Sequence, residues 1–300
     1  MNDDIFYISE LYSLYKYQSP KLAHYCFNWR SGFFIIKKGG VITMRTIVIA
    51  NNKGGVGKTS TSLCLAAGLR EKKKKVLLID LDAQENLRYA CGVSDEDLQG
   101  SSLYEVFYGK ANINNCLFQI YDNISDFDIL IGGDSLDDLE EDKRVKEDIL
   151  IKALQNLSVN YDYIVIDTPP ALHNKMTKAA LTAADDLIVP IEAASFSRQG
   201  LYKLFRAIRQ INPNINVAGL LLTKIKENTN ISKGYIELFQ NDAKEYGTKL
   251  YKAMIHNGVA IPESQTMKQT IYQYAPNSTV AKDYMNLVEE YLKGVKKNGR

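Results

Sequence analysis

The sequence has few of the residues from which metal sites, disulfide frameworks and membrane spans are built. It contains four cysteines and three histidines in 300 residues, and no two cysteines form a CxxC pair. This scarcity argues against disulfides and against a zinc site, and it is typical of a protein of the reducing cytoplasm. No run of about 18 apolar residues occurs, so we expect no membrane-spanning helix. Asp3 and Asp4 lie where a secretory signal would be positively charged, so we expect no signal peptide.

An excess of charge of one sign is also missing. The formal net charge is +2, and residues 1–43 hold five basic and three acidic side chains, so the two signs balance over the remaining residues. This balance gives no general attraction to nucleic acid, and any DNA binding must come from a local basic patch. With 45% hydrophobic and 24% charged residues, the chain has the composition of a folded domain with a large core.

The hydrophobic pattern changes at residue 44. Residues 1–43 are rich in aromatic side chains and have no steady helical or strand period, whereas strand and helix signals alternate from Met44 onward. We expect one α/β domain over 44–297, in which helices cover both faces of a mostly parallel twisted sheet. The expected strands are 46–50, 76–80, 129–131, 163–167, 187–191 and 217–223, and the expected helices are 58–71, 145–157, 176–184, 197–211, 232–246 and 279–296.

Residues 1–43 are interpreted as an N-terminal extension, either disordered or the product of a misassigned start. The Lys-Gly-Gly at 38–40 can be encoded by a purine run that would look like a ribosome-binding site upstream of Met44. The alternative is a real extension that binds a partner, with Trp29 and Phe33 as anchors.

A glycine-rich segment, NNKGGVGKTS at 51–60, joins the first strand of this domain to its first helix. Glycines allow several backbone N–H groups to converge on one anion, and the helix amino terminus adds partial positive charge. Lys58 can reach the β- and γ-phosphates of a nucleotide, and the Thr59 hydroxyl can ligate Mg²⁺. The segment therefore predicts a phosphate-binding loop.

Acidic residues follow two of the predicted strands. Asp80 and Asp82 come at the end of strand 76–80, and Asp167 ends strand 163–167. The carboxyl ends of parallel strands line the ligand crevice of an open α/β sheet, so these carboxylates should face the loop. Mg²⁺ keeps several waters, and carboxylates near it often act through them. Carboxylates at these strand ends, together with the Thr59 hydroxyl, are therefore candidates for contact with Mg²⁺.

Three segments, in order, resemble motifs of the ParA/MinD family of ATPases. KGGVGKTS at 53–60 resembles its deviant Walker A box, and YIVIDTPP at 163–170 resembles its Walker B and switch II segment. DLDAQEN at 80–86 resembles its switch I, usually DxDPQGN, with Ala83 in place of proline and Glu85 in place of glycine. The resemblance extends over about 45–292 and implies a P-loop ATPase domain that uses ATP and Mg²⁺.

The resemblance also implies roles for individual residues. Lys53 would reach the nucleotide of a partner subunit in an ATP-sandwich homodimer, Lys58 would bind phosphate, and Asp82 would orient the attacking water. These three form the implied catalytic set, and Thr59, Asp80 and Asp167 form the implied metal set. The implied nucleotide-binding residues are Lys53, Gly54, Gly55, Val56, Gly57, Lys58, Thr59, Ser60 and, in the base-side loop, Pro262.

Within the family, Gln84 after Asp82 and Ala83 favours the ParA/Soj type. This type implies a weak ATP hydrolase, cytoplasmic and nucleoid-associated, that binds DNA non-specifically and partitions a plasmid or chromosome with a ParB-like partner. The alternative is a MinD-like membrane-associated positioning ATPase with an amphipathic C-terminal helix. An apolar stripe does run through the tail (Leu287, Val288, Tyr291, Leu292 and Val295), but Glu289, Glu290 and Gly294 interrupt it and favour core packing.

Two further family types are disfavoured. A nitrogenase-iron-protein-like reductase needs cluster cysteines after the Walker B strand, and no cysteine follows Cys116. A bacterial tyrosine kinase carries a tail tyrosine cluster, and this tail has only Tyr284 and Tyr291.

The leading candidate for a DNA patch is one face of helix 197–211. Lys203, Arg206 and Arg209 share a face away from the apolar stripe of that helix. A basic helix face can also be simply solvated, and both readings stay open.

Overall fold

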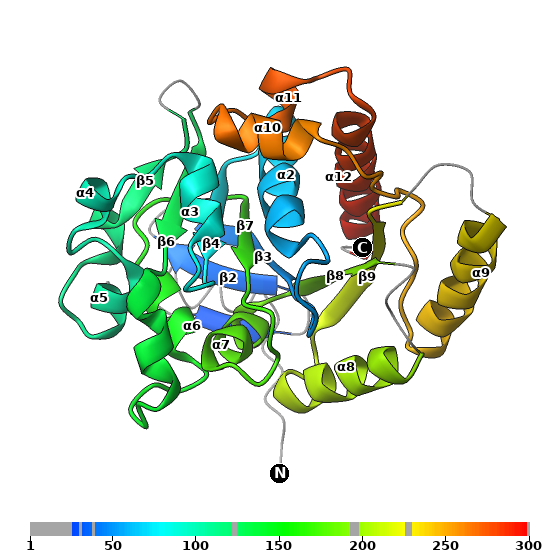
Figure 1. Ribbon diagram of the computed structural model, residues 1–300. Helices are drawn as coiled ribbons and strands as arrows, with labels where there is room; N and C mark the ends of the chain where they lie inside the picture. The colour runs from blue at the N-terminus through cyan, green and yellow to red at the C-terminus, as the bar shows by residue number, and fades with distance from the viewer. Residues whose placement is uncertain are drawn as a thin grey trace, which may run out of the picture.

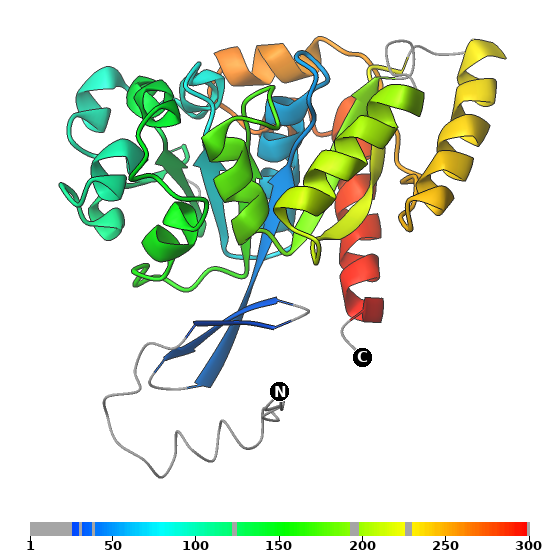
Figure 2. The ribbon, with the colours of Figure 1, turned by 90° about the horizontal axis from the view of Figure 1, so that it is seen from below.

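The chain forms an open, mostly parallel sheet with helices on both faces (Figures 1 and 2), as the alternation of strand and helix signals predicted. The structure is a computed structural model that describes residues 26–29, 32–37, 40–121, 125–192, 198–225 and 230–298. The strand order across the centre is β9-β8-β3-β7-β4-β6-β5, and only β5 runs antiparallel to its neighbour within this set. These strands are β3 (Gly40–Ile49), β4 (Val76–Asp80), β5 (Leu117–Gln119), β6 (Phe127–Ile131), β7 (Tyr163–Asp167), β8 (Asp186–Glu192) and β9 (Asn216–Thr223).

Side chains of the central strands alternate between two buried clusters, one on each face of the sheet. Ile47 and Val165 belong to the cluster that includes residues of α2 (Lys58–Glu71) and α12 (Thr279–Asn298). Val48 belongs to the other cluster, which is covered by α6 (Ile149–Leu154), α7 (Lys175–Ala183) and α8 (Arg198–Ile211). Because successive strand side chains point to opposite faces, apolar residues at every position require helices on both sides.

Several elements were not predicted. They are the helices α3 (Asn86–Cys91), α4 (Asp95–Leu98), α5 (Leu103–Phe107), α10 (Ala260–Thr266) and α11 (Ile271–Tyr274), the 3₁₀ turns η2 (Ile113–Asn115) and η3 (Asp134–Glu140), and the edge strand β5. All are short, and a helix of one or two turns shows too little of a 3.6-residue period to be recognised. The predicted helix 145–157 is also shorter in the structure, where only Ile149–Leu154 is helical. The predicted helix 232–246 corresponds to α9 (Asn230–Glu245).

The strand pattern before residue 44 was missed. β3 begins at Gly40, and β1 (Cys26–Trp29) and β2 (Gly32–Lys37) form an antiparallel ribbon on its amino end. Figure 2 shows this ribbon extending away from the central sheet. Residues 1–25 lie outside the described part of the chain, and the interpretation of 1–43 as an extension stays a prediction.

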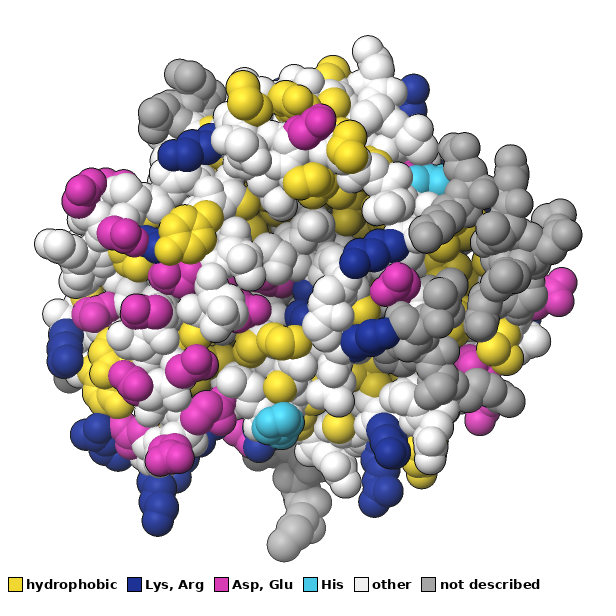
Figure 3. Space-filling model, in the orientation of Figure 1, with side chains coloured by type: hydrophobic (Ala, Val, Ile, Leu, Met, Phe, Trp, Pro, Cys, Tyr) yellow, Lys and Arg dark blue, Asp and Glu magenta, His cyan; other side chains and the backbone are white. Residues whose placement is uncertain are grey.

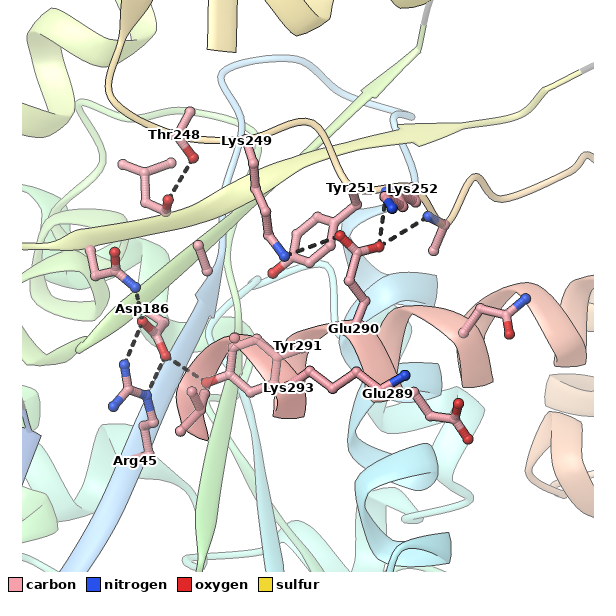
Figure 4. A pocket seen from close by; sticks show the side chains of 17 residues that line it. Arg45, Asp186, Thr248, Lys249, Tyr251, Lys252, Glu289, Glu290, Tyr291 and Lys293 are labelled. Atoms are coloured by element: carbon pink, nitrogen blue, oxygen red, sulfur yellow. Dashed lines mark hydrogen bonds and ion pairs between the residues drawn. The ribbon is translucent and has the colours of Figure 1, made fainter. Parts of the chain in front are cut away.

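A buried carboxylate joins four elements at the amino ends of the strands. Asp186 accepts hydrogen bonds from Arg45 Nε at 2.5 Å, from Asn216 Nδ2 at 2.5 Å and from the Tyr291 hydroxyl at 2.6 Å. Figure 4 shows Asp186 between Arg45 and Tyr291, on one side of a hollow of about 740 Å³. This hollow lies at the edge of the sheet opposite the glycine-rich loop, so it is separate from the predicted nucleotide site.

Candidate nucleotide site

The three strands that carry the motifs lie side by side. In the parallel register, Asp167 is opposite Ile49 on one neighbouring strand and opposite Asp80 on the other. The loop after β3 therefore leaves the sheet next to Asp167, with Asp80 one strand further along, and enters α2. Gly55 and Gly57 have φ of 73° and 84°, a left-handed conformation that favours glycine, and Gly57 directly precedes the helix.

Lys58 lies inside the curve of this loop. Its side chain is buried, and its ammonium group donates a 3.4 Å hydrogen bond to the backbone carbonyl of Lys53. Burial lowers the pKa of Lys58, while the charges of Asp167 and Asp82 act in the opposite direction. The structure thus brings Lys58 close to Asp167 and Asp82, two of the three predicted carboxylates. Lys53 itself is partly exposed in the loop.

Four further side chains fix the loop, and none of their hydrogen bonds was predicted from the sequence. The Thr223 hydroxyl donates to the Val56 carbonyl at 2.9 Å, and Asn51 Nδ2 donates to the Pro190 carbonyl at 2.6 Å. Asn52 Oδ1 accepts from the Leu172 backbone N–H at 3.3 Å, and the Thr168 hydroxyl donates to the Ile49 carbonyl at 2.8 Å. These bonds connect residues far apart in sequence, so no local pattern could reveal them.

Asp167 is fully buried behind the loop. Its Oδ1 accepts a 3.0 Å hydrogen bond from the Ser62 hydroxyl, and the Thr59 side chain also bonds to it. Its Oδ2 is buried and has no hydrogen-bond partner among the described residues. Burial raises the pKa of Asp167 to about 6, against the opposing effects of Thr59, Ser62 and Lys58.

Asp80 is equally buried and lies beside Asp167. Burial and the neighbouring charge of Asp167 raise its pKa well above the usual range, although the backbone N–H groups of Asp82 and Arg88 donate to its carboxylate. Two adjacent buried carboxylates are costly without a cation. A Mg²⁺ ion is a hard cation that prefers oxygen ligands, and the unpartnered Oδ2 of Asp167 offers one. The predicted set of Thr59, Asp80 and Asp167 therefore fits Mg²⁺.

Asp82 lies in a tight turn at the same edge. Its Oδ1 accepts the backbone N–H of Gln84 at 3.1 Å, and its backbone carbonyl accepts the N–H of Glu85 at 2.9 Å. The side chain is partly exposed, in contrast to the buried Asp80 and Asp167. Asp82 is thus oriented by its own turn and open to solvent, which suits a group that contacts water.

The structure gives little evidence on the predicted nucleotide-binding roles of Pro262 and Ser60. Pro262 is exposed in the first turn of α10, which packs against α3 and α11, and no described contact joins it to the loop. Ser60 is partly buried in the first turn of α2. The nucleotide-binding roles of both residues stay predictions.

The predicted DNA patch on α8 is exposed, but its three members differ. Lys203 lies beside a hollow of about 560 Å³ that also borders Asn52 and Lys178. Arg209 donates hydrogen bonds to the carbonyls of Pro213 and Ile215 at 2.9 and 3.1 Å, which fixes the segment that follows α8 against the helix. The charged groups of Lys203 and Arg206 are exposed and can contact a ligand, whereas the guanidinium of Arg209 also bonds to the segment after α8.

The tail stripe packs into the core, as predicted. Leu287, Val288 and Tyr291 on α12 are buried in the cluster on that face of the sheet. Among the residues that the structure describes, no helix is long and apolar enough to cross a membrane.

The chain matches the family model of an AAA domain over residues 44–218. It is 30% identical over 253 residues to the sporulation initiation inhibitor protein Soj of Bacillus subtilis, which covers 82% of this chain and 97% of that protein. A plasmid partition protein of Borrelia burgdorferi B31 bound to AMPPNP superposes with a TM-score of 0.72 at 28% identity, covering 84% of this chain and 99% of its own.

A third similar protein is a synthase. Cobyrinic acid a,c-diamide synthase of Mycobacterium smegmatis, with bound ADP and magnesium, superposes with a TM-score of 0.69 at 27% identity and covers 86% and 97% of the two chains. The nucleotide loop, the buried carboxylates and these similarities agree. The chain therefore belongs to the ParA/MinD family of P-loop ATPases.

Proposed function

We propose that this protein is a ParA-type partitioning ATPase. It binds ATP with Mg²⁺, hydrolyses it slowly, dimerises in the ATP state and moves a plasmid or chromosome over non-specific DNA with a ParB-like partner. The observation that carries the proposal is the convergence of Lys58, Asp167 and Asp80 behind a loop with two left-handed glycines. The partition proteins among the relatives support the choice within the family.

Nucleotide binding rests on the loop and the two strand ends. Backbone N–H groups of 54–59 and the Lys58 ammonium hold the phosphates, in a setting where burial strengthens the attraction. Thr59, Asp80 and Asp167 hold Mg²⁺, which when bound supplies positive charge at the phosphate oxygens. Ser62 keeps the Asp167 carboxylate oriented through its 3.0 Å hydrogen bond.

Hydrolysis depends on Asp82. Its carboxylate is held by the Gln84 N–H and lies close enough to Lys58 to affect that group electrostatically. We assign to Asp82 the orientation of the attacking water, a positioning task that does not hold the nucleotide. The rate then depends on how well the turn 82–85 keeps this carboxylate in place, which is consistent with slow turnover.

Dimerisation depends on Lys53. It belongs to the loop that surrounds Lys58, and it is partly exposed at the carboxyl edge of the sheet. A second cation supplied to the phosphates of a facing subunit makes ATP part of the interface. The dimer would form with ATP and separate after hydrolysis.

DNA binding is assigned to α8. Figure 3 shows acidic side chains gathered on the α5 and α6 side of the face that bears the loop, and η3 exposes Asp134, Asp137 and Asp138 there. DNA phosphates would be repelled from that side, and Lys203 and Arg206 offer the favourable charge on α8. A dimer doubles this patch, so binding should follow the ATP state.

The MinD-like alternative loses its main support, because Leu287, Val288 and Tyr291 of the apolar stripe are buried and Leu292 and Val295 pack against the same cluster. A partitioning ATPase that moves over DNA would act in the cytoplasm, on the nucleoid, and this is the localisation we propose. Retention of the protein on anionic liposomes with ATP, without retention on DNA, would favour the alternative.

Calorimetric titration with MgATP tests the nucleotide site. We expect Lys58→Ala to weaken binding by at least about 10-fold, because a charge-assisted bond to phosphate is lost. Lys244→Ala removes an exposed lysine of α9 and should bind like the parent protein. Equal affinity of Lys58→Ala and the parent would overturn the assignment.

A further inference from the structure

The turn after β4 contains a residue in an unfavourable backbone conformation. Glu85 has φ 53° and ψ 24°, a left-handed conformation that is unfavourable for a residue with a Cβ. Its N–H closes the turn on the Asp82 carbonyl, and its carbonyl accepts the N–H of Tyr89 as α3 begins. Glu85 thus connects the Asp82 turn to the following helix, and other contacts must stabilise its unfavourable backbone conformation.

The Glu85 side chain is held by a buried arginine. Glu85 Oε2 lies 3.1 Å from a guanidinium nitrogen of Arg88, whose side chain is 2% exposed. A second guanidinium nitrogen lies 2.6 Å from Asp95, which is largely exposed. The Arg88 backbone N–H donates to Asp80 Oδ2 at 3.2 Å. The Glu85–Arg88 pair therefore connects two sites: Glu85 ends the turn that contains Asp82, and the backbone of Arg88 bonds to the Asp80 carboxylate.

Stability does not explain this pair. A buried ion pair seldom contributes net stability, because both charges lose their hydration. Here the pair is also incompletely satisfied: Glu85 Oε1 and Arg88 Nε are buried without a hydrogen-bond partner among the described residues. An unfavourable backbone angle and two unsatisfied buried atoms at one turn are costs of the kind that persist at functional sites.

We propose that Glu85 and Arg88 are positioning residues for hydrolysis: their ion pair holds the turn 82–85 in the shape that directs the Asp82 carboxylate. This inference rests on the proposed role of Asp82. Neither side chain needs to contact ATP, so the pair should influence the rate of hydrolysis and not the affinity for nucleotide.

Three substitutions at Glu85 distinguish the effect of the ion pair from the effect of the unfavourable backbone conformation. Glu85→Ala removes the ion pair and keeps the backbone cost, Glu85→Gly removes the pair and relieves the cost, and Glu85→Gln keeps a hydrogen-bond acceptor for Arg88. We expect Glu85→Ala and Glu85→Gly each to lower kcat by about 10- to 100-fold, since small displacements of a positioning group have effects of this size. Glu85→Gln should recover part of the rate. The KM for ATP should change less than threefold in all of them.

Glu96→Ala is the matched control, because it removes an exposed carboxylate of the neighbouring helix α4. It should keep the parent kcat. The proposal is overturned if Glu85→Gly turns over like the parent, which would mean that only the backbone angle matters, or if KM rises in step with the fall in kcat. A parallel measurement on Asp82→Ala separates the two levels: if Asp82→Ala hydrolyses ATP normally, the role of Asp82 fails as well, and if only the Glu85 variants do so, this inference alone fails. Melting temperatures of all variants show that they fold.

Discussion

The Ser62 hydroxyl donates a 3.0 Å hydrogen bond to Oδ1 of Asp167, one turn into the helix that follows the phosphate loop. This bond orients a buried carboxylate whose other oxygen has no partner among the described residues. The helix that presents the loop therefore also orients the carboxylate that we propose to hold Mg²⁺. Such a contact beyond the ligands themselves is a usual way to tune a metal site.

Ser62→Ala should weaken Mg²⁺-dependent ATP binding by about 10-fold, in the range measured when partners of metal ligands are removed. Affinity for ATP without Mg²⁺ should change little, because Lys58 and the loop remain. Thr182→Ala removes a hydroxyl that donates to a helix carbonyl in α7 and serves as control. Titrations with and without Mg²⁺ provide the comparison, and an equal loss in both would contradict the role of Ser62.

Lys203→Glu with Arg206→Glu should abolish retention of the ATP-bound protein on DNA at low salt, because reversal converts phosphate attraction to repulsion. ATP-dependent dimerisation should persist. Arg209→Gln tests the third member of the patch, whose guanidinium donates to carbonyls of the segment that follows α8. It should lower the melting temperature more than the DNA affinity. Unchanged DNA retention of the double variant would place the patch elsewhere.

Tyr291→Phe should destabilise the fold without affecting the nucleotide site. The hydroxyl is one of the donors to buried Asp186, and losing a hydrogen bond to a buried charged group costs about 1–3 kcal/mol. For a domain of this size each kcal/mol lowers the melting temperature by about 2–4 °C. Thermal melts and MgATP titration together check this. A melting temperature equal to that of the parent would show that another group replaces the hydroxyl.

A chain that begins at Met44 should melt and hydrolyse ATP like the full chain, if residues 1–43 are an extension. The family model begins its match at residue 44; among the described strands, β2 pairs with the amino end of β3 and β1 pairs with β2. Intact-mass spectrometry of the native protein gives the natural start. A peptide from upstream of Met44, or a clearly lower melting temperature of the shorter chain, would contradict this interpretation.

The sequence was sufficient for the central sheet and for the residues of the loop. The helix Lys58–Glu71 and the strands Val76–Asp80 and Tyr163–Asp167 have the predicted bounds, because each has a strong apolar pattern and a motif at its end. The convergence of Lys58 with Asp167 and Asp80 followed from the rule that strand carboxyl ends share one edge.

Contacts that join distant residues could not be predicted in this way. The Thr223–Val56 bond and the Arg88–Glu85 pair depend on the three-dimensional arrangement of strands and turns. The spacing of residues in the sequence does not indicate this arrangement. The ribbon before residue 44 was missed because its aromatic residues do not alternate with polar ones. Arg209 looked like its neighbours on a helical face, and only the carbonyls beyond the helix end distinguish it.

The mass of the Asp82→Ala variant in solution tests the central claim most directly. Light scattering with MgATP should show a stable dimer, because the variant binds ATP but cannot orient the attacking water. With ADP the same protein should be a monomer, and adding Lys53→Ala should return the ATP form to a monomer. A dimer in ADP, or a monomer in ATP at saturating nucleotide, would contradict an ATP-dependent sandwich. Rapid hydrolysis by Asp82→Ala would contradict the assigned chemistry.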